Sequence, residues 1–111
     1  MRYEWEQQAK RNEPMPEGLP IADQAAYQAL AALVARYKLG AVNAEQAKKE
    51  RMEIDRAYGY RAAGDSLNGW TVSLRKRIEA AHAKFRKEPT VENAMYLSDV
   101  LDGFERRLND G

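Results

Sequence analysis

The sequence predicts an all-α single domain of four or five helices, and three observations lead to that prediction. Apolar residues recur at intervals of three and four in several stretches, which is the periodicity of an amphipathic helix. Charged residues make up 32% of the 111-residue chain, and frequent Ala, Glu, Lys and Arg favour solvated helices over strands. Prolines and glycines separate these stretches, as at Pro20, Gly40 and Pro89. A chain of this length suits one hydrophobic core.

Residues 1–20 are predicted to be an N-terminal segment that ends in a proline-rich connector. Residues 1–12 are compatible with a short terminal helix, with Trp5 and Ala9 on its apolar side. Pro14, Pro16 and Pro20 then block regular structure, because each lacks an amide donor and disfavours a helical residue before it.

Residues 21–63 are predicted to form a helical hairpin. The first of its helices covers residues 21–39, and its apolar stripe comprises Tyr27, Leu30, Val34 and Tyr37, widened by Ala26 and Leu33. Gly40 can end that helix in the left-handed conformation, and Asn43 can cap the next one. The next helix is expected over residues 44–63 and has a thinner apolar side. Its short link to the first helix favours an antiparallel pair.

Residues 68–108 are predicted to form a basic helix followed by an apolar one. Cap residues for the basic helix are Asp65, Ser66 and Asn68, and its core arc comprises Trp70, Leu74, Ile78, Ala81 and Phe85. Pro89 should end it, and Thr90 should cap the apolar helix, whose stripe is Ala94, Leu97, Leu101, Phe104 and Leu108. We expect the hairpin to pack against this second pair.

Composition and charge exclude several classes of protein. The net charge is +1, so the whole molecule lacks a field that would steer it to DNA or an anionic membrane. The chain has no cysteine, which excludes disulfides and thiolate metal sites. Its first residues do not resemble a signal peptide, and no apolar run is long enough for a membrane span. We therefore expect a soluble, cytoplasmic protein that does not bind membranes.

The best candidate for a binding surface is the basic helix. Only Glu79 and Glu88 offset its cations, which are Arg75, Lys76, Arg77, Lys84, Arg86 and Lys87. These side chains could contact phosphates or an acidic protein surface, although charge runs on helices are usually plain solvated faces. Tyr60 and Tyr96 fall outside the apolar stripes and are candidate exposed anchors for a partner, whereas the other aromatic residues on stripes suit the core.

No motif indicates catalysis, a cofactor or a metal. Phosphate-binding glycine loops, nucleophile elbows and metal-ligand spacings are all missing. His82 is the only histidine and reads as a structural or surface residue, since it lacks the partners of a catalytic pair. Asp99 and Asp102 lie three apart, yet two carboxylates without a ligand-rich loop make a weak cation site. We expect a protein that is not an enzyme and has no cofactor.

Several segments together resemble a known group of proteins. They are 14–19, the helix from Tyr27 to Gly40, 45–50, 77–81, 85–87 and 90–94. The whole chain is similar to small helical accessory proteins of unassigned function that are encoded in phages and prophages of Gram-positive, gut-type bacteria. That resemblance implies a setting in the host cell, where most such proteins bind a host or phage macromolecule. Inhibitors of bacterial immunity, including anti-CRISPR proteins, are prominent among them.

The leading hypothesis for function is a non-catalytic phage protein that blocks a host defence complex, a protein or ribonucleoprotein, by protein contact. Two alternatives stay open, namely a regulatory accessory protein that binds nucleic acid and a phage assembly factor. A homodimer is a further expectation, because an apolar helix stripe left uncovered in the monomer must be covered elsewhere.

Overall fold

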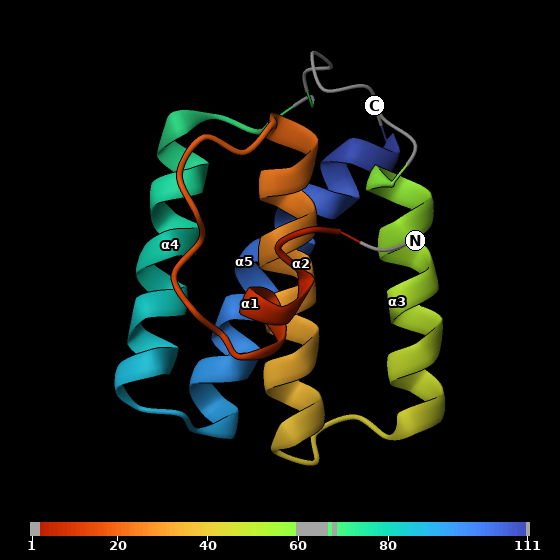
Figure 1. Ribbon diagram of the computed structural model, residues 1–111, viewed down its shortest axis with the longest axis vertical. Coiled ribbons are helices and arrows are strands. Elements are labelled where there is room, and N and C mark those ends of the chain that lie inside the picture. Colours follow the sequence, from red (N-terminus) through yellow and green to blue (C-terminus); the bar gives the residue numbers. More distant parts are fainter. Residues whose placement is uncertain (1–2, 60–66, 68, 111) are drawn as a thin grey trace.

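The computed structural model describes residues 3–59, 67 and 69–110, without the side chains of 105–110. Every regular secondary-structure element within these ranges is a helix, which confirms the predicted fold class. The helices are α1 (Glu6–Lys10), α2 (Ile21–Lys38), α3 (Ala44–Tyr58), α4 (Val72–Lys87) and α5 (Val91–Asp110). Figure 1 shows α2 in the middle, with α3 and α4 on opposite sides, α5 behind and α1 in front.

Helix α2 is the centre of the core because it packs on each of the other four helices. It is buried on nearly all sides, and its large core residues Tyr27, Leu30 and Leu33 are interspersed with many alanines. Alanine keeps the helix intact while its short side chain lets neighbouring helices approach closely. The predicted hairpin of α2 and α3 is present, and α2 carries the contact of that hairpin with α4 and α5.

Several helix ends lie where the sequence predicts them. Gly40 has a φ of 76°, and the amide of Ala41 donates to the carbonyl of Arg36, so α2 ends in a Schellman motif. The Oδ1 atom of Asn43 accepts from the amide of Gln46 at 2.8 Å, which caps α3. Thr90 likewise caps α5 through the amide of Asn93.

Other boundaries differ from the prediction. Helix α1 is one short turn, and α3 ends at Tyr58, five residues before the expected boundary. Helix α4 begins at Val72 because the Oγ1 atom of Thr71 accepts from the amide of Leu74 at 3.0 Å. The predicted caps Asp65, Ser66 and Asn68 lie outside the described residues. Helix α5 continues beyond the expected end to Asp110.

Two aromatic residues also depart from their predicted places. Trp70 precedes α4 instead of belonging to it, and its ring packs edge-on against Phe104, with the centroids 5.1 Å apart. Its indole donates to the Oε1 atom of Gln24 at 3.1 Å, so Trp70 joins α2 to α5. Tyr37 was expected in the core stripe, yet it is 48% exposed because it lies in the last turn of α2, close to where the helix ends.

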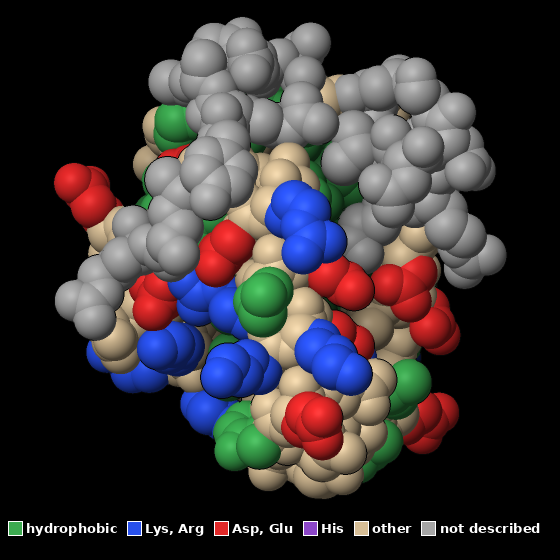
Figure 2. All heavy atoms as spheres, turned by 90° about the vertical axis from the view of Figure 1, so that its right-hand side faces the viewer, with side chains coloured by type: hydrophobic (Ala, Val, Ile, Leu, Met, Phe, Trp, Pro, Cys, Tyr) green, Lys and Arg blue, Asp and Glu red, His purple; other side chains and the backbone are tan. Residues whose placement is uncertain are grey.

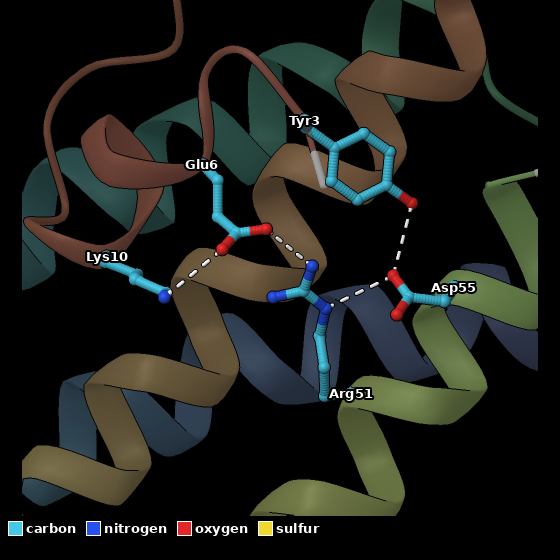
Figure 3. A network of polar contacts seen from close by, with 5 residues as sticks. All are labelled: Tyr3, Glu6, Lys10, Arg51 and Asp55. Atoms are coloured by element: carbon cyan, nitrogen blue, oxygen red, sulfur yellow. Dashed lines mark hydrogen bonds and ion pairs between the residues drawn. The ribbon is translucent and has the colours of Figure 1, made fainter. Parts of the chain in front are cut away.

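The N-terminal arm, residues 3–20, covers the face of α2 opposite α5 (Figure 1). Tyr3 stacks on Trp5 with centroids 4.3 Å apart, and Trp5 packs edge-on against Tyr27. Figure 3 shows how Arg51 of α3 holds the arm, because its guanidinium pairs with Glu6 at 2.6 Å and with Asp55 at 3.1 Å. Burial alone would raise the pKa of Glu6, but hydrogen bonds from Arg51 and Lys10 hold it below the usual value.

None of the described helices combines the length and the apolar character that a membrane crossing requires.

Candidate partner-binding surface

Helix α4 presents one narrow apolar side to the core and leaves the rest of its circumference exposed. Ile78, Ala81 and Phe85 are buried, at the spacing that the sequence predicts. Among the predicted cations, only Arg75 is half-buried, and its Nε atom lies 3.8 Å from the carboxylate of Glu79. The remaining cations are exposed and have no ion pair within the described part of the chain: Lys76, Arg77, Lys84, Arg86 and Lys87.

The six cations do not form a single patch. Because each residue turns an α-helix by about 100°, Arg75 and Arg86 lie on one flank of the apolar side and Arg77 and Lys84 on the other. Lys76 and Lys87 point away from the core between these flanks. The sequence predicted that this helix is basic. The way the helix is oriented toward the core places its cations on three separate surfaces.

We define the α4–α5 face as Arg77, Lys84 and Tyr96. The ammonium of Lys84 lies 5.6 Å from the centroid of the Tyr96 ring, which is a cation–π distance. Arg77 stands two turns before Lys84 on the same flank of α4. Tyr96 is 51% exposed, as its position outside the core stripe predicted, and it belongs to α5. This face therefore combines an aromatic ring with two cations that have no ion pair within the described residues.

Tyr60, the other predicted anchor, lies outside the described residues. Helix α5 also exposes apolar residues that the sequence did not assign to a partner surface, on a different side of the helix from Tyr96. Val91 is 45% exposed and Met95 is 42% exposed. Because Val91 and Met95 are four residues apart, helical periodicity could have predicted that α5 has an exposed apolar side in addition to its core stripe.

Arg86 lies at the edge of a hollow between the N-terminal arm and the end of α4. The hollow has a volume of about 520 Å³, and its walls include Pro14, Leu39 and Phe85. Arg11 and Lys38 also border it, but Arg11 pairs with Glu13 and Lys38 donates to the carbonyl of Lys10. Cations in the last turn of a helix also offset the partial negative charge of its carbonyls. The hollow is therefore a weaker candidate than the α4–α5 face.

His82 is a buried structural residue. It is 1% exposed, and its Nε2 atom lies 2.9 Å from the Oδ1 atom of Asn12 in the N-terminal arm. Asn12 has a φ of 57°, so it ends α1 in the left-handed conformation while its side chain reaches α4. Burial, with Arg86 as a second cause, lowers the pKa of His82 to about 4. His82 is thus neutral at pH 7 and binds the arm to α4.

The acidic residues considered as ligands do not form a metal cluster. Within the described residues, no three carboxylate, imidazole or thiol side chains lie close enough together to hold a metal ion. Asp102 instead borders a groove between α3 and α5, together with Glu50 and Glu53. The sequence did not predict this groove, because α3 and α5 are far apart in the chain.

The chain matches no protein-family model, no curated protein and no solved structure.

Proposed function

We propose that this protein is a small, non-catalytic binding protein of the phage accessory type, which blocks a host defence complex by protein contact through the α4–α5 face. The observation that carries the proposal is a pair of exposed cations, Arg77 and Lys84, on the flank of α4 where Lys84 lies over the exposed ring of Tyr96. The phage setting comes from the resemblance of the chain to such accessory proteins.

The chemistry of the face suits an acidic protein surface. Aromatic and arginine side chains are enriched among the residues that dominate binding energy at interfaces. Unpaired cations accelerate association with an acidic partner and do not have to break an internal ion pair first. The adjacent apolar side of the same helix packs on the core, so the backbone that carries Arg77 and Lys84 is already ordered before binding.

A pull-down from lysate of a bacterial host tests the proposal. The intact protein should recover a defence protein or ribonucleoprotein. The double variant Arg77→Glu, Lys84→Glu should lose this capture, and Tyr96→Ala should weaken it. Lys48→Glu, Lys49→Glu on α3 is the matched control, because both lysines are exposed and the change in charge is the same. Recovery of virion components alone, or equal capture by all variants, would refute the proposal.

A second candidate function is regulatory binding of nucleic acid, which the excess of six basic over two acidic side chains on α4 and its C-cap favours. This alternative predicts that the purified protein shifts DNA or RNA at low salt and that the affinity falls steeply as salt rises. The leading proposal predicts no shift. A phage assembly factor would be indicated by a gene position among late structural genes.

A further inference from the structure

The hollow beside Arg86 lies where the N-terminal arm crosses the ends of α2 and α4. We call it the arm hollow, and its walls are residues 11–14 of the arm, Lys38 and Leu39 at the end of α2, and Phe85, Arg86 and Pro89 at the end of α4. Figure 1 shows the arm passing in front of the space between these two helices, toward their lower ends. The volume of about 520 Å³ lies in the range of pockets that hold small molecules.

The charge of the arm hollow is positive. Among the described residues that line it, the three cations Arg11, Lys38 and Arg86 face one carboxylate, Glu13, so the local net charge is +2. Glu13 pairs with Arg11, and the excess charge therefore lies at Lys38 and Arg86. The groove between α3 and α5 differs, because two arginines and three acidic residues line it. Figure 2 looks onto the α3 side and likewise shows basic and acidic side chains intermingled.

Neither of these two cations has to leave an ion pair in order to bind an anion. Arg86 is exposed and has no ion pair within the described part of the chain. The ammonium of Lys38 donates to the carbonyl of Lys10, which fixes its position without neutralising its charge. An anion therefore meets one cation that is already positioned and one that is unpaired, which limits the ordering cost of binding.

Two helix ends reduce this positive charge but do not cancel it. Helix α2 ends at Lys38 and α4 ends at Lys87, so both end beside the arm hollow. The C-terminus of an α-helix carries a partial charge of about −0.5, and two such ends bring the effective charge from +2 to about +1. A carboxylate matches that value with its single negative charge. A phosphate monoester carries about −1.5 to −2 and would be repelled more strongly by the carbonyls of the helix ends.

The remaining walls of the arm hollow suit an apolar body. Pro14, Leu39 and Pro89 contribute apolar surface, and Phe85 forms a buried part of the wall, since this residue is only 6% exposed. Pockets for small molecules typically combine such apolar walls with a few polar groups that fix the orientation of the ligand. An ion of the size of acetate would leave most of this surface uncovered. The ligand should therefore carry its carboxylate on a hydrocarbon body.

We propose that the arm hollow binds a small aliphatic or aromatic carboxylate, whose head group contacts Lys38 and Arg86 and whose apolar body packs on the walls around Phe85. The ligand then joins the ends of α2 and α4 beneath the N-terminal arm. This inference goes beyond the proposed function, because it concerns a small molecule and does not use Arg77 or Lys84. A protein surface would reach only the rim of the hollow, so the α4–α5 face remains the better candidate for contact with a defence complex.

Titration of the intact protein with 3-phenylpropionate at pH 7 tests the proposal. The ring-proton NMR signals of His82 report binding, because Asn12 lines the hollow and its Oδ1 atom lies 2.9 Å from the imidazole. These signals should shift until saturation, with a Kd on the order of 1 mM for a ligand of this size. Two comparison compounds should bind at least about tenfold more weakly, namely 3-phenylpropionamide, which lacks the charge, and acetate, which lacks the apolar body. Phenyl phosphate should not bind more tightly than 3-phenylpropionate.

Substitution of the two cations provides a second test. The variant Lys38→Gln, Arg86→Gln should bind 3-phenylpropionate at least about tenfold more weakly than the unchanged protein. The matched control is Arg77→Gln, Lys84→Gln, which also removes one arginine and one lysine but none that line the hollow, and it should bind like the unchanged protein. Circular dichroism should show that both variants keep their helical content, since all four substituted residues are exposed.

Several outcomes would overturn the proposal. They are an absence of shifts in the His82 signals, equal binding of the amide or of acetate, tighter binding of phenyl phosphate, and unchanged affinity of the Lys38→Gln, Arg86→Gln variant. The host pull-down depends instead on Arg77 and Lys84. Failure of either experiment leaves the other unaffected, so the two proposals fail independently.

Discussion

Lowering the pH from 7 to 5 should destabilise this protein through a single side chain, His82. It is the only histidine in the chain, and it is buried against Asn12 of the N-terminal arm. Burial lowers its pKa from 6.5 to about 4, whereas in the unfolded chain it should titrate near its ordinary value. As the pH falls, His82 therefore binds a proton in the unfolded state before it does so in the folded state.

The direction and the size of the change in stability follow from the difference between the folded and unfolded pKa values of His82. The contribution of His82 to stability is complete above pH 6.5 and is lost as the pH falls through 6.5 toward the folded pKa of about 4. Between pH 7 and pH 5 the free energy of unfolding should decrease by about 2 kcal/mol from this residue. Below pH 4 the total loss from this residue should be about 3 kcal/mol, since each pKa unit corresponds to about 1.4 kcal/mol.

Urea denaturation at pH 7 and pH 5 measures this loss, and His82→Gln provides the control. Glutamine keeps a side-chain donor for Asn12 and does not titrate, so its free energy of unfolding should change far less between the two pH values. The ring-proton NMR signal of the single histidine should remain unshifted from pH 7 to pH 5 in the folded protein. A ring titration with a midpoint near 6.5, or equal pH dependence in both proteins, would refute the reasoning.

Three further predictions concern packing and capping, and urea denaturation measures each of them. Thr71→Ala should lower the free energy of unfolding by about 1 kcal/mol because it removes the N-cap of α4, whereas Thr71→Ser should be nearly neutral. Equal effects of the two substitutions would show that the Thr71 hydroxyl does not cap the helix. Phe104→Ala should lower the free energy of unfolding by about 3–5 kcal/mol, because the ring is 1% exposed and packs on Trp70. A loss below about 1 kcal/mol would show that the ring is not in the core. Ala32→Leu should lower the free energy of unfolding by about 1–3 kcal/mol, because the larger side chain overpacks the centre of the bundle. Ala83→Leu, on the exposed side of α4, should change it by less than about 0.5 kcal/mol. Similar losses at both sites would contradict the central position of α2.

The helices and several of their ends could be predicted because their signals are local. A helix ends at Gly40 because glycine adopts a positive φ without strain, and Asn43 and Thr90 accept hydrogen bonds from amides three residues ahead. The arc of Ile78, Ala81 and Phe85 follows from the helical period alone. The prediction for the start of α4 was wrong because several residues before it could serve as caps, and the chain uses Thr71.

The candidate site could be predicted only in part. The sequence located the cations on one helix and placed Tyr96 outside the core. It did not indicate that Lys84 lies beside Tyr96, since that distance depends on how α4 packs against α5. Nor did it predict the groove with Ser98, because its walls belong to helices that are separated by more than thirty residues.

By itself, the sequence determined that this protein is helical, where most of its helices lie and which of them is basic, since periodicity, caps and charge are properties of neighbouring residues. Only the tertiary structure decided that α2 is the central helix, that the N-terminal arm covers one of its faces, and that the opposite face opens into a groove. The orientation of each helix depends on contacts with all the others. The same contacts divide the cations of α4 into three surfaces and set the pKa of His82.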